Sequence, residues 1–301
     1  MGQPLVATVV LNTDRRDDTL DCLRSLRHSS YSNRRDIVLD NHSTDGSLDA
    51  IGAEFPGVEV VHLQENLGYA GNNNVGIRMA LAMGADWVLV LNEDTILAPD
   101  CLEHLVGVAG EVPRVGVVGP MVYHHDEPDV IQSGGGILDS RWRSGHRRQN
   151  ERGGGEQTRP LAVDYISGCA IMVRRAAIEQ VGMIDERFFY YWEETEWCLR
   201  IRRGGWAVLL VPGARLWHKG VTRNYRPGPS VTYYNTRNRL FMMSKHRAPL
   251  GVRAAAWFDV GRTLASWSVR PKWRGQRAHR DAMWRGLRDH LCGRLGRMPD
   301  R

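Results

Sequence analysis

Short apolar runs alternate with amphipathic stretches along the first part of the chain. Runs rich in β-branched residues stand at 5–11, 37–39, 58–63 and 86–91. Apolar side chains continue through successive positions of these runs, as in strands buried on both faces. Segments with helical spacing separate them, at 20–28, 48–55 and 74–83. Strands that alternate with helices at this distance predict an α/β fold with a mostly parallel central sheet flanked by helices.

Polar residues stand where the predicted strands end. Asn12 follows the first strand, Asp40-Asn41 follow the second, and Asn92-Glu93-Asp94 follow the fourth. Ligands of open α/β sheets collect at the carboxyl ends of the strands. A carboxylate there suits a hard divalent cation, which can hold a diphosphate. The alternative is a polar strand end that turns into the next helix.

A second group of carboxylates follows an aromatic segment. Residues 188–192 contain five aromatic side chains and lead into Glu193, Glu194 and Glu196. Carboxyl groups behind an aromatic wall should have raised pKa values, which suits a general base. A plain helix N-terminus, where the helix dipole favours Glu, explains the same residues. We keep both interpretations at this point.

Charge divides the chain in two. Residues 237–301 contain 16 Lys+Arg and 4 Asp+Glu, whereas residues 1–236 contain 24 and 30. An acidic body (net −6) with a basic tail (net +12) indicates an anionic partner for the tail, unless the tail is a solvated basic helix pair. A helical stripe at 252, 256, 260, 264 and 267 fits packing against the body as well as lipid. We therefore predict a catalytic domain at 1–236, with an irregular insertion or lid at 123–160, and a basic, mainly helical extension at 237–301.

The five cysteines form no CxxC pair, which favours reduced thiols and a cytoplasmic location. No apolar run is long enough to span a bilayer, and residues 1–11 do not read as a signal peptide. The basic tail adds the expectation of peripheral contact at the inner face of the plasma membrane. We expect no nucleic-acid partner, and homo-oligomerisation stays open.

Four motifs then occur in an order and spacing that we recognise. They are Val38–Ser47 (VLDNHSTDGS), Asn66–Asn73 (NLGYAGNN), Leu91–Asp94 (LNED) and Phe188–Arg200 (FFYYWEETEWCLR). With them the chain resembles the inverting family 2 glycosyltransferases of the GT-A fold, in the branch of bacterial rhamnosyl- and galactofuranosyltransferases. The resemblance covers roughly residues 5–245.

The resemblance implies roles for individual residues. Glu194 would be the catalytic base, with Glu193 second, and Asp94 and His218 would hold Mg²⁺ or Mn²⁺. Tyr191 and Trp192 would contact the acceptor. The donor would be bound by Asn12, Asp40, Asn41, Asn72, Asn92, Glu93, Asp94 and Arg200.

Two positions depart from the family pattern. Asn92 stands where the first Asp of an Asp-x-Asp motif is usual, so the site has one strong carboxylate fewer. Glu193-Glu194 replaces the usual Glu-Asp, which lengthens the arm of the base by one methylene. A base must lie within about 3 Å of the proton that it takes, so the longer arm shifts the acceptor or weakens catalysis.

The implied reaction is transfer of a sugar, with inversion, from a nucleotide-diphosphate donor to an acceptor hydroxyl. dTDP-rhamnose or a similar dTDP- or UDP-sugar is the expected donor. The acceptor would be a saccharide, a lipid-linked saccharide or a small molecule, as in cell-wall or natural-product glycosylation. Two alternatives stand beside this: a sugar-nucleotide-binding protein that has lost turnover, and a sugar nucleotidyltransferase. The second would carry a glycine-rich loop after the first strand, where this chain has Asn12-Thr13-Asp14.

Overall fold

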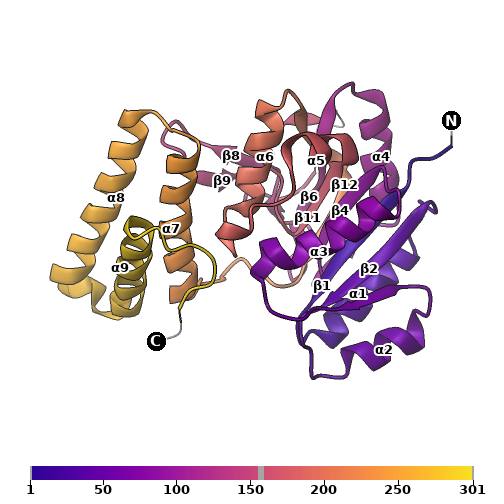
Figure 1. The fold of residues 1–301 in the computed structure, drawn as a ribbon, viewed down its shortest axis with the longest axis horizontal. Coiled ribbons are helices and arrows are strands. Elements are labelled where there is room, and N and C mark those ends of the chain that lie inside the picture. The colour runs from indigo at the N-terminus through magenta and orange to yellow at the C-terminus, as the bar shows by residue number, and fades with distance from the viewer. Residues whose placement is uncertain (1, 155–158, 300–301) are drawn as a thin grey trace.

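The computed structural model describes residues 2–154 and 159–299, and its centre is a mixed β-sheet (Figure 1). Ten of the described strands belong to this sheet, whose main path runs β10-β12-β6-β11-β4-β1-β2-β3, with β5 on β12 and β7 on β6. Their bounds are β1 Val6–Asn12, β2 Arg34–Asp40, β3 Glu59–His62, β4 Trp87–Asn92, β5 Thr95–Leu97, β6 Val115–His124, β7 Ile131–Ser133, β10 Leu161–Ala162, β11 Ala170–Arg174 and β12 Ala207–His218. The pairs among β1 to β4 are parallel, and β11 runs antiparallel to both β4 and β6. The predicted α/β class with a central sheet is confirmed, with a reversal of direction at β11.

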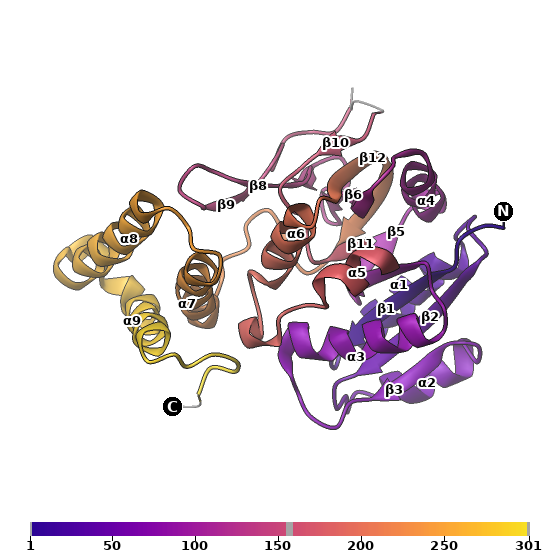
Figure 2. The same cartoon turned by 45° about the horizontal axis from the view of Figure 1, so that its top comes forward.

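Helices cover both faces of the sheet (Figure 2). They are α1 Arg16–Arg27, α2 Ser47–Glu54, α3 Gly68–Ala82, α4 Cys101–Glu111, α5 Arg175–Val181 and α6 Glu193–Arg203. Alternate residues of β4 face opposite layers: Leu89 packs with α1, α2 and α4, and Val90 packs with α3, α5 and α6. Strands buried on both faces explain the continuous apolar runs in the sequence.

The helix predicted at 74–83 begins earlier than expected. α3 starts at Gly68, so the three consecutive asparagines lie in its first turns and are buried. Asn72 Oδ1 accepts a hydrogen bond from the Leu67 amide at 2.9 Å, and Asn74 Nδ2 donates to the Ile184 carbonyl at 2.8 Å. These side chains hydrogen-bond backbone groups of neighbouring segments. Asparagines in a surface turn, as the sequence suggested, would not make such contacts.

The described part of the segment at 123–160 is more regular than the sequence suggests. β7 pairs with β6, and β8 (Gly136–Leu138) and β9 (Ser144–His146) form a separate two-stranded sheet. Residues 155–158 lie outside the described part. β7 joins this segment to β6 of the central sheet.

Three helices form the C-terminal extension, on the side away from β2 and β3 (Figures 1 and 2). They are α7 Pro229–Lys245, α8 Leu250–Val269 and α9 Arg277–Leu291. The predicted boundary at 236 falls inside α7, so the helical part begins at Pro229. Within 2–154 and 159–299, no helix is long and apolar enough to cross a membrane.

Candidate active site

A cavity of about 690 Å³ opens at the carboxyl ends of β1 and β4. Its wall is formed by the β4–β5 turn, the first turns of α3 and α6, the aromatic segment 189–192, and side chains from β7, β9, the end of β12 and α7. Segments from almost the whole chain therefore meet at one place. Most of the expected site residues lie in this wall: Asn41, Asn72, Asn92, Glu93, Asp94, Tyr191, Trp192, Glu193, Glu194 and His218.

Asp94 and His218 come together because β5 pairs with the end of β12. The strand register places His218 opposite Thr95, and the Lys219 amide donates to the Asp94 carbonyl at 2.8 Å. Asp94 Oδ1 then lies 3.0 Å from His218 Nε2. Burial acts to raise the pKa of Asp94, but the interactions with His218 and Arg15 outweigh it and hold that pKa below its usual value.

Gln132 fixes the orientation of the His218 ring. Its amide Oε1 lies 3.0 Å from His218 Nδ1. An amide oxygen can only accept a hydrogen bond, so Nδ1 donates to it and Nε2 is the ring nitrogen that faces Asp94. Histidine ligands of metal ions are commonly oriented by such a second contact.

The donor set fits a hard divalent cation. When the imidazole is neutral with its proton on Nδ1, Nε2 and Asp94 Oδ1 are both electron-pair donors, and Oδ1 is buried without a hydrogen-bond donor among the described residues. Groups of this kind 3.0 Å apart repel each other unless a proton or cation lies between them. Gly220 keeps the space open, because a Cβ there would lie 2.1 Å from Asp94 Oδ2. No cluster of three or more His, Cys, Asp and Glu that could hold a metal occurs among the described residues. The remaining coordination positions would therefore fall to water or to phosphate oxygens, as is usual for Mg²⁺.

Glu93 and Arg15 extend this charged corner of the cavity. Arg15 lies 3.9 Å from Glu93 Oε1 and 3.8 Å from Asp94 Oδ2. Burial, and then the neighbouring Asp94 charge, raises the pKa of Glu93 to about 7. The sequence interpretation missed Arg15, because an arginine after a strand end has no distinguishing signal.

Glu193 and Glu194 begin α6 and line the same cavity. Glu193 is 4% exposed, and its Oε2 has no hydrogen-bond partner among the described residues. Burial raises the pKa of both carboxyl groups, and the charge of Glu194 adds to the effect on Glu193. Tyr69 lies next to them and donates its hydroxyl to the Gly168 carbonyl. The pair therefore has the raised basicity that the sequence predicts.

The turn before α6 has an unusual backbone. Phe189, Tyr191 and Trp192 all have positive φ, at 65°, 66° and 76°. Such conformations cost about 1–3 kcal/mol each in non-glycine residues and persist only where the surroundings enforce them. Gly68 permits the close approach of α3, since a Cβ there would lie 2.4 Å from the Phe189 carbonyl oxygen.

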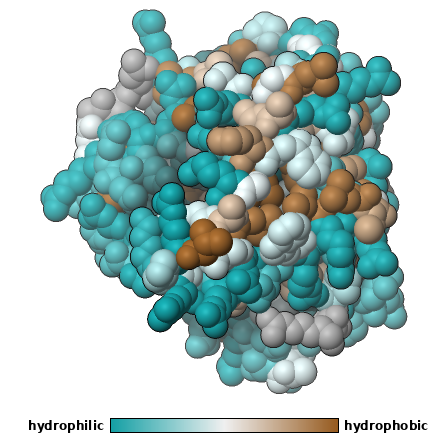
Figure 3. Space-filling view, turned by 90° about the vertical axis from the view of Figure 1, so that its left-hand side faces the viewer, coloured by the Kyte–Doolittle hydropathy of each residue, from teal (hydrophilic) through white to brown (hydrophobic). Residues whose placement is uncertain are grey.

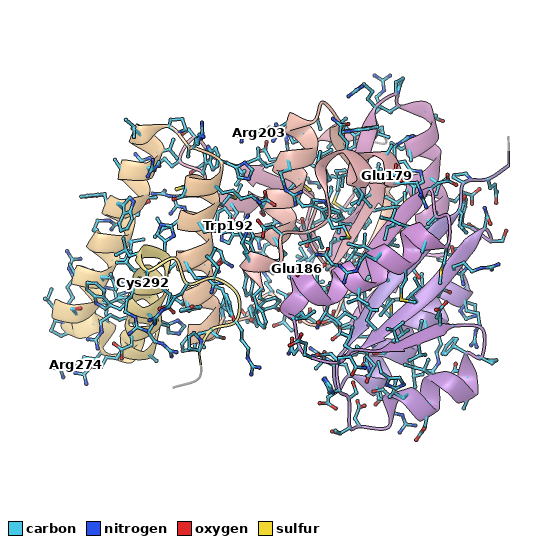
Figure 4. All side chains as sticks on the ribbon, in the orientation of Figure 1. Glu179, Glu186, Trp192, Arg203, Arg274 and Cys292 are labelled. Carbon is cyan, nitrogen blue, oxygen red and sulfur yellow. The ribbon has the colours of Figure 1, made fainter. Side chains whose placement is uncertain are left out.

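α7 holds this turn in place. Asn238 Nδ2 lies 3.0, 2.9 and 2.9 Å from the carbonyl oxygens of Phe188, Tyr190 and Tyr191. Trp192 Nε1 donates to Asn235 at 3.0 Å, and Trp192 lies between α6 and α7 (Figure 4).

A buried hydrogen-bond chain reinforces the contact. Arg237, which is 0% exposed, donates to the Phe188 carbonyl at 3.0 Å and to the Tyr233 hydroxyl at 3.2 Å. The Tyr233 hydroxyl donates in turn to Asp289 of α9 at 2.8 Å. The extension is thus a structural support of the turn that carries Glu193 and Glu194.

Asn12 and Asp40 lie behind the cavity wall. Their side chains hydrogen-bond each other at 3.1 Å, and Asn12 also accepts from Thr19 at 2.8 Å. Both are buried, and neither lines the cavity, although the neighbouring Leu11, Thr13 and Asn41 do. A contact of Asp40 with a nucleobase stays a prediction that needs the wall to open.

Arg200 does not lie where the resemblance implied. Its Nε is 2.9 Å from both carboxylate oxygens of Glu196, and its Nη atoms donate to the carbonyls of Val181 and Met183 at 2.6 Å. It does not line the cavity. A donor contact of Arg200 stays a prediction, since in this structure Arg200 lies on the face of α6 that holds the α5–α6 connection.

A second cavity of about 400 Å³ adjoins the first. The two share Ser144, Trp192 and Asn235 in their walls, and the second extends between α7, α8 and α9 to Leu240, Val260 and Met283. Nothing in the sequence indicated it, because its wall forms only when three helices and β9 meet.

Comparison with known proteins gives consistent results. The family described as Glycosyl transferase family 2 matches residues 6–182. The N-acetylglucosaminyl-diphospho-decaprenol L-rhamnosyltransferase of Mycobacterium tuberculosis is 29% identical over 242 residues, which cover 71% of this chain and 77% of that protein. The dTDP-rhamnosyl transferase RfbF of Shigella flexneri is 25% identical over 222 residues, covering 71% and 72%.

Solved structures share the fold at low sequence identity. GalNAc-T7 with UDP, GalNAc and Mn²⁺ gives a TM-score of 0.63 at 16% identity, over 78% of this chain and 47% of that one. The mannosyltransferase PcManGT from Pyrobaculum calidifontis with GDP-Man and Mn²⁺ gives 0.59 at 15% identity, over 97% and 88%. The match of the family over more than half of the chain, together with the GT-A-like sheet, shows that this protein belongs to glycosyl transferase family 2.

Proposed function

We propose that the protein is a metal-dependent, inverting rhamnosyltransferase that uses dTDP-rhamnose or a closely similar dTDP- or UDP-sugar. The observation that carries the proposal is one cavity lined by two chemically distinct groups. Asp94 and His218 form a pair suited to a cation, and Glu193-Glu194 form a pair with raised pKa values. The names of the two rhamnosyltransferase relatives support the choice of sugar.

In the proposed reaction Glu194 takes the proton of an acceptor hydroxyl. The oxygen attacks the anomeric carbon as the bond to the donor's diphosphate oxygen breaks, and that oxygen keeps the electron pair. A single displacement inverts the anomeric centre. Mg²⁺ or Mn²⁺ held by Asp94 and His218 would neutralise charge on the leaving diphosphate. Asn92 would orient a donor oxygen through its amide group.

The acceptor is expected on the Tyr191–Trp192 side of the cavity. The adjoining cavity of about 400 Å³ begins at Trp192 and is bordered by Leu240 and Met283 as well as by two arginines, Arg143 and Arg239, which share the single carboxylate of Asp259 and leave a net positive charge. This mixture of apolar and basic groups favours an acceptor larger than one sugar with a negatively charged part, such as a lipid-linked saccharide.

The test is a screen of nucleotide sugars with Mn²⁺, with release of nucleoside diphosphate as the readout. We expect release with dTDP-rhamnose in the presence of an acceptor. Glu194→Gln should retain donor binding and lose about 10²–10⁴ in turnover, the usual contribution of a general base. Near-normal turnover of Glu194→Gln would contradict the assignment of the base.

Two further results separate the alternatives. Tight donor binding without any release in wild-type protein would indicate a sugar-nucleotide-binding protein. Pyrophosphate formation from dTTP and a sugar phosphate would indicate a nucleotidyltransferase.

A further inference from the structure

The outer side of α8 exposes a row of apolar residues. Of the nine exposed large hydrophobic side chains in the described ranges, six belong to the segment 250–291. Leu250, Trp257, Phe258 and Val269 are 80, 37, 68 and 76% exposed. Their spacing places them on one face of the helix, together with the exposed Ala254, Gly261 and Ala265. We call these seven residues the outer stripe.

The outer stripe is distinct from the stripe that the sequence pointed to. Ala256, Val260 and Leu264 of that other stripe are buried, in a core with Leu240 and Leu287. α8 is therefore apolar on two faces, and only one of them is covered by the protein. The uncovered face runs along all 20 residues of α8, about 30 Å at 1.5 Å per residue. Figure 3 shows hydrophobic side chains in a band among hydrophilic ones on this side of the molecule.

Basic residues border the outer stripe. Arg253, Arg262 and Arg270 are exposed and make no ion pair with any described residue. The acidic residues of α8 and α9 are mostly turned inward: Asp259 pairs with Arg143 at 2.6 Å, and Asp289 is fully buried. The exposed charge beside the stripe is consequently positive. This agrees with the net charge of +12 for residues 237–301.

We infer that the outer stripe of α8 docks on a lipid bilayer that contains anionic lipids. A long helix with aromatic and aliphatic side chains on one face and arginines at its edges matches the requirements of the membrane interface. The outer stripe would insert at the boundary between headgroups and acyl chains, and the arginines would bind the anionic headgroups.

Charge argues against a second copy as the occupant. A two-fold contact through the outer stripe would bring together two extensions with a net charge of +12 each. Like charges at a shared interface oppose association. A nucleic acid would use the arginines but would leave Leu250, Phe258 and Val269 in water.

The inference is tested by vesicle flotation of the full-length protein. The vesicles are phosphatidylcholine alone, or phosphatidylcholine with a quarter phosphatidylglycerol. We expect flotation with the anionic vesicles, weaker flotation with the neutral ones, and loss of the difference at high salt. Trp257→Ser/Phe258→Ser should reduce partitioning by about tenfold or more, since burial of one large side chain has that effect.

Matched variants separate the two parts of the surface. Arg253→Gln/Arg262→Gln should weaken flotation severalfold on anionic vesicles and leave neutral vesicles unchanged. Ile137→Ser, which alters an exposed apolar residue of β8 outside the extension, should float like wild type. Because all the altered side chains are exposed, circular dichroism and melting temperature should show that the variants are folded.

Two outcomes would overturn the inference. The first is wild-type protein that stays at the bottom with anionic vesicles. The second is a dimer in light scattering that disappears in Trp257→Ser/Phe258→Ser, which would make a second copy the occupant. Flotation does not depend on sugar transfer, so the result stands apart from the outcome of the donor screen.

Discussion

Glu193 and Glu194 are two adjacent carboxyl groups kept largely out of water. They make no ion pair with any described residue, and Glu193 Oε2 accepts no hydrogen bond from the described part of the chain. Isolated buried carboxylates are costly, so such a pair favours the protonated form of at least one member. A raised pKa is what a base needs if it is to take a proton from a hydroxyl near neutral pH. The burial that raises the basicity of this pair therefore lowers the stability of the folded protein.

The cost of ionising a buried carboxyl group predicts that Glu193→Gln stabilises the protein at alkaline pH. The folded-state pKa of Glu193 lies above the unfolded value, so its favourable contribution is complete below the unfolded pKa and is lost as pH rises through the folded pKa. At about pH 8 the substitution removes this cost, and each kcal/mol gained raises the melting temperature by roughly 2–4 °C. The gain should shrink toward about pH 4, where the wild-type carboxyl is protonated in both states.

Melting temperatures from calorimetry across this pH range provide the check. Glu179→Gln, at an exposed residue on α5 (labelled in Figure 4), serves as the control and should show little change. An unchanged or lower melting temperature for Glu193→Gln at alkaline pH would contradict the account.

At the cation end of the cavity, Gln132 predicts a measurable effect on metal affinity. Gln132→Leu removes the acceptor of the His218 Nδ1 proton and frees the ring to turn. Loss of such an orienting partner typically weakens metal binding about 10–100-fold. The free Mn²⁺ signal in electron paramagnetic resonance, with dTDP present, measures this directly. Gln64→Leu, at an exposed loop residue, should bind Mn²⁺ like wild type; equal affinities for all three proteins would argue against His218 as a ligand.

Among the elements, α7 has a role that its place in the extension does not suggest. The turn before α6 contains three non-glycine residues with positive φ, and α7 supplies the donors to its carbonyl groups. The strain in this turn is offset by Asn238 of α7, which lies 48 residues after Tyr190 in the chain. α7 therefore supports one wall of the candidate active site.

This arrangement predicts that Asn238→Ala affects turnover more than donor binding. Without the amide, the carbonyls of Phe188, Tyr190 and Tyr191 lose a shared donor in a buried place. An unsatisfied buried group costs about 1–3 kcal/mol, so the melting temperature should fall by several degrees. The turn should then hold Glu194 less well, and kcat should fall while KM for the donor changes little.

Steady-state kinetics, with Asn33→Ala as a control at an exposed residue, separates this from a general loss of stability. Measured well below the lower melting temperature, a kcat equal to wild type would show that α7 supports the fold but not the base.

At the scale of the whole molecule, the sequence predicted the secondary structure elements that follow from local hydrophobic patterns. It missed side-chain positions that depend on contacts between residues far apart in the chain. The α/β class followed from apolar runs such as 87–91, in which Leu89 and Val90 are buried on opposite faces of the sheet. The cavity followed from polar residues at strand ends, because parallel strands bring those ends to one edge. Helical spacing did not show that Arg200 lies on a face of α6 that does not line the cavity. Gln132 carried no signal, since its contact lies 86 residues away.

The extension shows the same limit. Periodicity identified the stripe of α8 that turned out to be its core, and the outer stripe was overlooked because small residues such as Ala254 and Gly261 interrupt it. Which of two apolar faces is covered depends on where α7 and α9 pack, and that is a property of the assembled fold.

The hydrogen-bond chain from Phe188 through Arg237 and Tyr233 to Asp289 has a consequence for building hybrid enzymes. An exposed loop precedes α7, and joining two related chains in this loop would exchange their C-terminal helices. A hybrid joined there would pair the turn of one parent with the arginine and asparagine of the other. A crossover upstream of Phe188 keeps the aromatic turn with its partners on α7 and α9.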